Sequence, residues 1–407
     1  MTQPQVRAGA PAATQRHSPL RVMVVDDSAV VRGILVRTLE VHEELLVVAS
    51  VANGEIALRA QTQHKPDVIL LDIEMPVMDG LTALPKLMAA DPWCCVIMVS
   101  TLTRENAVVT MQALKDGAAD YLTKPTSAIT AAESFRRDLL GKIIGLGQAH
   151  RDRRRQGTTL PAAATDARAP TNAPAATRPP GSTIPAATPA TRPTTAPRAS
   201  AGTHVPLRHS KAIRAPAALA IGSSTGGPQA LIAVFEALEV SRQQPIFITQ
   251  HMPPTFTAIL AEQLTNHGKW ACHEGADGMA VEPGHAYIAP GDYHMTVQDK
   301  DGHKVIRLNQ DAAENYCRPS VDVMLRSITK AYAGSVVAVI LTGMGQDGLA
   351  GGRHLVDAGG HVVAQDEASS VVWGMPGAVA TAGICDAILP LADVAGYINR
   401  LVAGAPS

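Results

Sequence analysis

The sequence has little that would indicate a protein that is exported, membrane-bound or stabilised by a structural metal or by disulfides. No apolar run reaches the ~18 residues that a membrane-spanning helix needs, and the first twenty residues lack the apolar core of a signal peptide. A formal net charge of -1 provides no general attraction to nucleic acid or to an anionic membrane. No CxxC pair is present, so neither a zinc site nor a disulfide framework is expected. The cysteines are scattered and odd in number: Cys94, Cys95, Cys272, Cys317 and Cys385. These absences together predict a protein of the reducing cytoplasm.

The chain is long enough for two domains, and it contains a segment that separates them. A chain of 407 residues is too long for one typical domain. Residues 19–140 and 215–403 both alternate short apolar runs with helical patterns. Residues 1–18 resemble a disordered arm, and residues 141–214 a linker rich in Pro, Ala, Thr and Arg. Such a linker buries too little apolar surface to offset its ordering entropy, so we expect an extended tether.

Charged residues follow three apolar runs of the first domain at the point where each run ends. Asp26 and Asp27 follow the first run, Asp72 follows the second, and Lys124 follows the third. Buried parallel strands have this apolar character, and ligand groups in open α/β sheets gather at the carboxyl ends of the strands. A single Asp after a strand needs no explanation beyond a polar loop. The ordered set predicts a site where carboxylates hold Mg²⁺ and Asp72 is a nucleophile for phosphoryl transfer.

The same set resembles the receiver domain of bacterial response regulators. The βα alternation predicts a five-stranded doubly wound sheet, and the resemblance implies a flavodoxin-like parallel sheet with strand order 2-1-3-4-5. It also implies that Asp72 is the phospho-acceptor and that Lys124 contacts the phosphate. Ser100 and Tyr121 match the switch hydroxyl and the switch aromatic. The implied Mg²⁺ ligands are Asp26, Asp27, Asp72 and the backbone carbonyl of Glu74.

The second domain contains a G-x-S-x-G pattern centred on Ser224, between an apolar run and a helical pattern that begins near Pro228. A tight turn from strand to helix exposes the central hydroxyl, and the helix N-terminus favours an oxyanion beside it. Gly-rich turns of this kind also bind phosphates. However, the stretch lacks the Gly-Lys-Ser/Thr ending of a P-loop and a clean G-x-G-x-x-G, so nucleotide binding is the weaker interpretation.

A serine nucleophile needs a base, and the base needs an orienting carboxylate. His251 directly follows the apolar run that ends at Gln250, and Asp347 follows the run that ends at Leu341. A lone histidine is more often packed or solvated than catalytic, and Asp347 could be a turn residue before Gly348. Their joint occurrence with Ser224, at three strand ends of a mostly parallel α/β domain, favours a catalytic triad.

Long stretches of this second domain resemble the chemotaxis protein-glutamate methylesterases, the CheB-type response regulators. The resemblance implies that Ser224 is the nucleophile, His251 the general base and Asp347 the orienting carboxylate. It places the oxyanion-binding backbone N–H at Met344. Arg318 becomes a candidate for substrate contact. The stretch that contains it also has a purely structural explanation, in which Ser320 caps a helix. The matching stretches are residues 221–227, 250–254, 283–291, 318–323, 341–348, 365–369 and 374–376.

This resemblance implies a phosphorylation-activated hydrolase that gives adaptation in bacterial chemotaxis. A sensor histidine kinase would phosphorylate Asp72 with Mg²⁺ present, and the receiver would then move away from the triad. Ser224 would attack methylated glutamates of chemoreceptors and release methanol, and the same chemistry would deamidate receptor glutamines. The esterase itself would need no cofactor. Contact with the membrane would occur only through receptor proteins, and no nucleic acid partner is expected.

Three other functions are compatible with parts of the pattern. The chain could be an amidase or esterase with a different substrate, because a fold does not fix its substrate. It could be a phosphorylation-controlled binding module with a vestigial triad. It could also be a DNA-binding response regulator, but no basic recognition helix follows the tether and the second domain is larger than a typical DNA-binding module.

Overall fold

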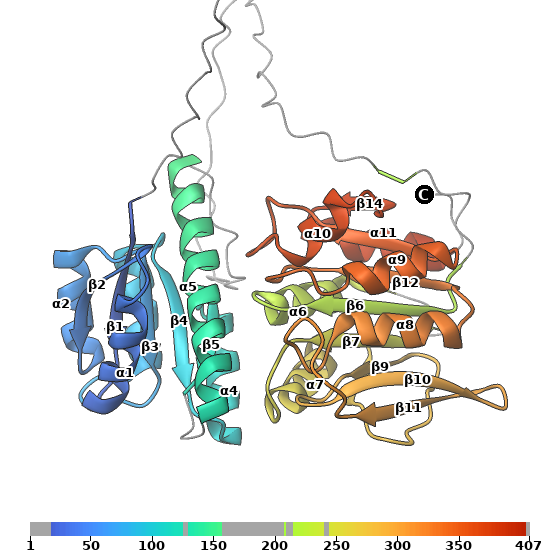
Figure 1. Cartoon of the computed structure of the whole chain (residues 1–407), viewed down its shortest axis with the longest axis horizontal. Coiled ribbons are helices and arrows are strands. Elements are labelled where there is room, and N and C mark those ends of the chain that lie inside the picture. Colours follow the sequence, from blue (N-terminus) through green and yellow to red (C-terminus); the bar gives the residue numbers. More distant parts are fainter. Residues whose placement is uncertain (1–17, 125–128, 157–206, 209–214, 240–243, 404–407) are drawn as a thin grey trace, which may run out of the picture.

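The computed structural model describes residues 18–124, 129–156, 207–208, 215–239 and 244–403. These residues form two α/β domains (Figure 1). The predictions made for the arm and for most of the linker lie outside the described residues. Within the described part of the chain, no helix is both long enough and apolar enough to cross a membrane.

The first domain is a five-stranded parallel sheet with strand order β2-β1-β3-β4-β5, as predicted. Its central strands are buried apolar runs, and the helices between them begin at side-chain caps such as Ser28, whose hydroxyl accepts a hydrogen bond from Val31 N–H. The strands are β1 (Leu20–Val25), β2 (Leu45–Val51), β3 (Val68–Asp72), β4 (Cys95–Ser100) and β5 (Asp120–Thr123). The helices are α1 (Ala29–Glu40), α2 (Gly54–His64), α3 (Gly80–Ala90), α4 (Arg104–Lys115) and α5 (Ile129–Gln156).

Helix α5 continues well beyond the predicted end of the first domain. Leu139, Ile143 and Leu146 of this helix lie in the same hydrophobic cluster as residues of β1 and β3. At Gly147 a Cβ atom would lie 2.8 Å from the Val68 side chain, so the glycine lets the helix approach the sheet closely. The predicted linker start at residue 141 is therefore too early. Gly141 of the same helix also makes a close approach, to the side chain of Met344.

The second domain contains a seven-stranded parallel sheet with order β14-β13-β12-β6-β7-β9-β8. A hairpin of β10 and β11, which the sequence analysis did not anticipate, is antiparallel. The strands are β6 (Ala218–Ser223), β7 (Ile246–Gln250), β8 (Ala271–Glu274), β9 (His285–Ile288), β10 (His294–Lys300), β11 (His303–Asn309), β12 (Val336–Ile340), β13 (His361–Gln365) and β14 (Ala387–Leu389). The helices are α6 (Gly227–Ala237), α7 (Phe256–His267), α8 (Val321–Ala331), α9 (Leu349–Asp357), α10 (Met375–Thr381) and α11 (Leu391–Val402).

Strand β6 is the point where the strand order of this sheet reverses. Its two neighbours are β7, which follows it in the chain, and β12, which comes much later. In open α/β sheets the carboxyl ends of strands at such a switch point flank the ligand site. The residues after β6, β7 and β12 are those where the sequence predicts the triad.

Helices α4 and α5 lie on the side of the first domain that faces the second (Figure 1). The ring of Tyr121 stacks on that of Phe256 in α7, with centroids 4.7 Å apart and planes 3° from parallel. Gln229 of α6 donates to the carbonyls of Leu114 and Ala118, each at 3.3 Å. A single hydrophobic cluster contains buried residues of both domains. The two domains therefore share a packed interface.

Candidate functional site

The first candidate site lies at the carboxyl ends of β1 and β3. One carboxylate oxygen from each of Asp26, Asp27 and Asp72 lies within 4.8 Å of the other two. Asp26 and Asp72 are buried and Asp27 is exposed. Lys124 follows β5, and its Nζ lies 3.0 Å from Asp26 Oδ2 and 2.8 Å from Asp72 Oδ2. The structure thus brings together the four side chains that the sequence placed at this edge.

The donor set suits a hard divalent cation. Carboxylate oxygens are the ligands that Mg²⁺ prefers, and three of them converge here. Burial is the main reason that the pKa of Asp72 rises to about 6; Lys124 opposes this rise and Asp26 adds to it. A bound cation would favour the ionised Asp72 that nucleophilic attack requires. Glu74 lies two residues beyond β3, and the part of its carbonyl in metal binding stays a prediction.

The two predicted switch residues occupy different positions. Ser100 ends β4 and is buried, and its hydroxyl donates to Thr101 O at 3.1 Å. Tyr121 lies in β5, where its ring is buried against Phe256 of the second domain. Lys142 of α5 donates to Tyr121 O at 2.7 Å. A movement of Tyr121 would therefore disturb the interface directly.

Ser224 lies in the turn between β6 and α6. Gly227 N–H donates to Ser224 O at 2.7 Å, and Gly226 has φ 74° at the helix N-cap. A Cβ atom at Gly226 would lie 2.5 Å from Val371, so both conformation and space require glycine there. Ser224 is half-buried, whereas its neighbour Ser223 is buried and donates to Gln250 Oε1 at 2.6 Å. Ser223 thus holds the turn, and Ser224 is the hydroxyl left available.

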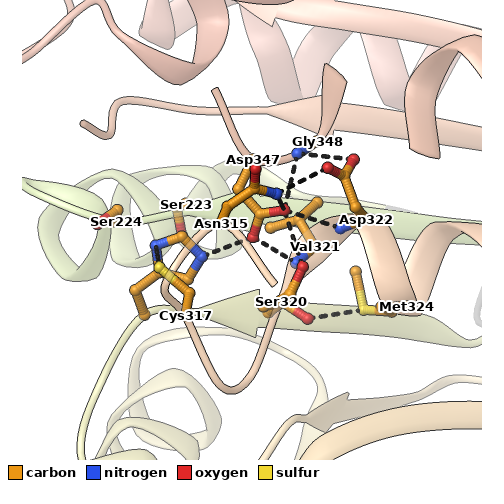
Figure 2. Close-up of polar contacts among 12 residues, drawn as sticks. Ser223, Ser224, Asn315, Cys317, Ser320, Val321, Asp322, Met324, Asp347 and Gly348 are labelled. Carbon is orange, nitrogen blue, oxygen red and sulfur yellow. Dashed lines mark hydrogen bonds and ion pairs between the residues drawn. The ribbon is translucent and has the colours of Figure 1, made fainter. Parts of the chain in front are cut away.

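His251 is held beside this turn by the sheet. Ser223 and Gln250 are partners across β6 and β7, and His251 N–H donates to Ser223 O at 3.1 Å. The ring Nε2 lies 2.8 Å from Asp347 Oδ2, a contact drawn in Figure 2. Among the described residues the Ser224 hydroxyl has no hydrogen-bond partner. The pair of base and carboxylate is therefore formed, and the bond from Ser224 to the base is not.

The second nitrogen of His251 has a partner that sequence reasoning missed. Its Nδ1 lies 3.4 Å from Cys317 Sγ. Burial opposes the charged ring, but Cys317 and Asp347 outweigh burial and raise the pKa of His251 to about 10. In this arrangement Cys317 lies at the ring nitrogen that would have to take the proton of Ser224.

Asp347 is held by the N-terminus of α8. Burial would raise its pKa, but the bond to His251 and the backbone N–H donors lower that pKa to about 2. Sequence reasoning missed these supporting donors, and it assigned Ser320 as a helix cap. In the structure Ser320 makes no capping bond, and its hydroxyl points to the Asp347 carboxylate instead (Figure 2). The donors are Ser320 Oγ at 2.9 Å, Val321 N at 2.7 Å, Asp322 N at 3.0 Å, Asn315 Nδ2 at 2.9 Å and Gly348 N at 3.1 Å.

Asp322 holds groups that lie next to the Asp347 carboxylate. Its Oδ1 accepts from Gly348 N at 3.0 Å and from Gly351 N at 2.6 Å, and its Oδ2 accepts from Asn315 Nδ2 at 2.9 Å. It therefore ties the start of α9 to the start of α8, with Asp347 between them. Burial first, and then the charge of Asp347, raise the pKa of Asp322 to about 6.

We expect Asp322→Asn to change how stability depends on pH. A carboxyl group whose pKa is higher in the folded than in the unfolded state stabilises the fold fully at pH values below its unfolded pKa. This contribution is lost as pH rises through the native pKa of about 6. Between pH 4 and pH 7.5 the wild type should lose on the order of 2 kcal/mol that the amide variant does not lose. Urea unfolding at both pH values measures this difference. Asp357→Asn, on the exposed side of α9, is the matched control and should behave as the wild type. Equal pH dependence of Asp322→Asn and wild type would contradict the assignment.

The Gly343-Met344 turn passes directly against Ser224. A Cβ atom at Gly343 would lie 2.9 Å from Ser224 Cβ and 3.0 Å from Ser224 N. The Met344 N–H donates to no other described residue, so it remains available beside the serine. A Cβ atom at Gly141 of α5 would lie 2.6 Å from Met344 Cε, so the Met344 side chain lies against the first domain. This turn joins the serine environment to the domain interface.

Arg318 has a structural explanation. Its Nε and Nη2 donate to Asp292 Oδ1 at 3.0 and 2.6 Å. Its Nη1 donates to the carbonyls of Gln310 and Asp311, each at 3.0 Å. Every guanidinium nitrogen is thus used to hold the neighbouring loops, and the structure adds nothing to the predicted substrate contact.

Both domains match known protein families. Residues 22–134 match the response regulator receiver domain, and residues 219–398 match CheB methylesterase. A protein-glutamate methylesterase/protein-glutamine glutaminase 1 of Paramagnetospirillum magneticum is 51% identical over 94% of this chain and 96% of its own length. A relative of the same name, without the numeral, from Azospirillum brasilense is 49% identical over 99% and 98%. The catalytic domain of Thermotoga maritima CheB methylesterase is a solved structure with 38% identity, covering 46% of this chain and 99% of its own, with a TM-score of 0.45. Identity of this extent over the whole length shows that the chain belongs to the CheB methylesterase family, with a receiver domain ahead of the catalytic domain.

Proposed function

We propose that this chain is a protein-glutamate methylesterase and protein-glutamine glutaminase that phosphorylation activates, and that it serves adaptation in bacterial chemotaxis. Its relatives carry the names of both activities. The observation that carries the proposal is the 2.8 Å contact between His251 and the buried Asp347. His251 directly follows Gln250, which pairs with Ser223 at the end of β6. A serine in a nucleophile turn, a base and an oriented carboxylate are what acyl transfer requires.

The reaction follows from the positions of these groups. Ser224 Oγ attacks the side-chain ester carbonyl of a methylated glutamate and gives its proton to His251 Nδ1, the nitrogen not bound to Asp347. The Met344 N–H donates to the oxyanion, a contribution worth about 3 kcal/mol in comparable sites. Methanol leaves with the proton from His251, and water then hydrolyses the acyl-enzyme. A glutamine side chain follows the same steps and releases ammonia.

Control by phosphorylation follows from the interface between the domains. A sensor histidine kinase is the proposed phosphodonor, and methylated chemoreceptors are the proposed substrate. Arg137 of α5 lies 4.2 Å above the Tyr316 ring, one residue before Cys317. Together with the approach of Gly141 to Met344, this contact supports a receiver that covers residues next to the proposed triad. Mg²⁺ at the three aspartates would supply charge neutralisation for transfer of the phosphoryl group to Asp72. Rearrangement of Ser100 and Tyr121 would then loosen the Phe256 stacking.

The test is methanol release from methylated receptor membranes, with and without acetyl phosphate. We expect Asp72→Asn to keep the basal rate and to lose stimulation by acetyl phosphate, because the amide cannot accept the phosphoryl group. Chelation of Mg²⁺ should remove stimulation from the wild type in the same way. Glu43→Gln, in the exposed turn between α1 and β2, is the control and should respond as the wild type. An undiminished response of Asp72→Asn would remove Asp72 from its role.

The same assay separates the proposal from its competitors. Hydrolysis of a simple ester without methanol release from receptors would indicate an esterase with another substrate. Failure of a serine-reactive phosphonate to label Ser224 would favour a binding module with a vestigial triad.

A further inference from the structure

One of the five cysteines differs from the other four in its surroundings. Cys94, Cys95, Cys272 and Cys385 are buried, whereas Cys317 is partly exposed. Burial raises the pKa of the buried thiols, to about 12 for Cys272 and Cys385, and a thiol that stays protonated is a poor nucleophile. Cys317 is therefore the cysteine that solvent and a base can both reach.

The base that reaches Cys317 is His251. Asp347 occupies Nε2, so Nδ1 is the nitrogen that must take the proton of Ser224. That same Nδ1 lies 3.4 Å from Cys317 Sγ, while the Ser224 hydroxyl has no partner among the described residues. A thiol and an alcohol thus compete for one nitrogen, and in this structure the thiol has it. Figure 2 shows Cys317 and Ser224 in the same part of the site.

The position of Cys317 is fixed by the chain around it. Cys317 N–H donates to Glu314 O at 2.9 Å and Glu314 N–H donates to Cys317 O at 3.2 Å, which closes a tight turn. Asn315 within that turn donates to both Asp322 and Asp347. The segment that carries the thiol is therefore anchored to the carboxylate that orients His251.

We propose that Cys317 is a site of reversible oxidation by peroxide, and that its oxidation switches the esterase off. His251 Nδ1 takes the proton from Sγ while the sulfur attacks one peroxide oxygen. An S–O bond forms, the O–O bond breaks, and the leaving hydroxide collects the proton and departs as water. The sulfur is oxidised by two electrons to a sulfenic acid and the peroxide is reduced. Two equivalents of a small thiol return the sulfenic acid to the thiol, with water and a disulfide of the small thiol as the other products.

Oxidation should block the esterase because of where the new oxygen lies. The sulfenic oxygen must occupy space beside Nδ1, since only 3.4 Å separates that nitrogen from the sulfur. A sulfenic acid there occupies the nitrogen that Ser224 needs. The inactivation rests on the proposed esterase function, whereas the formation of the sulfenic acid does not.

The first experiment reads the chemistry alone. The full-length protein is treated with hydrogen peroxide, sulfenic acid is trapped with dimedone, and the cysteine peptides are identified by mass spectrometry. We expect the label on Cys317 and at least about tenfold less on each of the other four cysteines. His251→Gln should lower the rate of labelling at Cys317 by at least about tenfold, because it removes the proton acceptor. An unlabelled Cys317, or an unchanged rate in His251→Gln, would overturn the proposal.

The second experiment reads the consequence. Each protein is measured for methanol release before and after peroxide, as a fraction of its own untreated rate. The wild type should lose at least about nine-tenths of its rate and regain it with dithiothreitol. Cys317→Ser should keep its own rate, and Cys317→Ala serves if the serine variant does not fold. The control Cys272→Ser, a buried cysteine of β8, should remain as sensitive as the wild type. Equal inactivation of Cys317→Ser and wild type would contradict the proposal, and absent methanol release in every untreated protein would instead overturn the proposed function.

Discussion

Ser224→Ala should lower methanol release from methylated receptors by about 10⁶-fold in kcat, as loss of the nucleophile does in a well-studied serine hydrolase. The loss should persist with acetyl phosphate present, because the proposed phosphorylation of Asp72 would uncover the site but could not replace the attacking oxygen. The turn itself should survive the change, since Ser224 O and not its hydroxyl accepts from Gly227 and Gln250. Thermal unfolding close to that of the wild type would show that only the chemistry is lost.

Ser223→Ala provides the matched control for this prediction. Ser223 is buried and donates to Gln250, so its removal should cost about 1 kcal/mol of stability. It should still allow a serine-reactive phosphonate to label Ser224, whereas Ser224→Ala should show no label. Full turnover by Ser224→Ala, or a phosphonate label on another serine, would end the assignment of the nucleophile.

Asp347→Asn should lower kcat by about 10⁴-fold, the size of effect that an amide causes at the corresponding position of a serine protease. Five donors besides His251 converge on this carboxylate, and an amide offers one acceptor oxygen to all of them. The amide nitrogen would then face either these donors or the ring. If the amide nitrogen faces the ring, His251 Nε2 must accept a hydrogen bond from it. The ring proton then lies on Nδ1, which can no longer accept a proton from Ser224.

The stability of Asp347→Asn gives an independent measurement. A carboxyl group whose native pKa is lowered to about 2 stabilises the fold at pH values above its unfolded pKa. This contribution is lost as pH falls through the native pKa of about 2. The wild type should therefore lose stability between pH 4 and pH 2 more steeply than Asp347→Asn, in urea unfolding at each pH. Asp357→Asn should keep the steep loss of the wild type. A kcat within tenfold of the wild type would show that Asp347 does not orient the base.

Local sequence pattern was sufficient for the fold class and for the edges where chemistry is placed. Apolar runs such as Val68–Leu71 predict buried parallel strands, and the receiver has the expected strand order. Because parallel strands all end at the same edge, Asp26, Asp72 and Lys124 had to meet there once those strands were recognised. The same reasoning placed His251 and Asp347 at neighbouring strand ends, and their side chains do lie in contact.

Local pattern was not sufficient where a side chain had two plausible partners. Ser320 precedes a helix and has the composition of a cap, but the carboxylate of Asp347 lies within reach and takes its hydroxyl instead. Cys317 has no motif around it that indicates a base, because His251 is 66 residues away in the chain. The linker was predicted to start at residue 141 because the packing of α5 against β1 and β3, at residues such as Gly147, has no local signature.

The amino-acid sequence by itself determined that this protein has two α/β domains and which residues stand at the ends of their strands, since strand periodicity and turn chemistry are properties of neighbouring residues. Only the tertiary structure decided which of these groups hold one another: Asp322 and Ser320 behind Asp347, Cys317 at the free nitrogen of His251, and Tyr121 against Phe256. Hydrogen bonds and stacking act over a few ångströms, so they depend on which distant segments folding brings into contact.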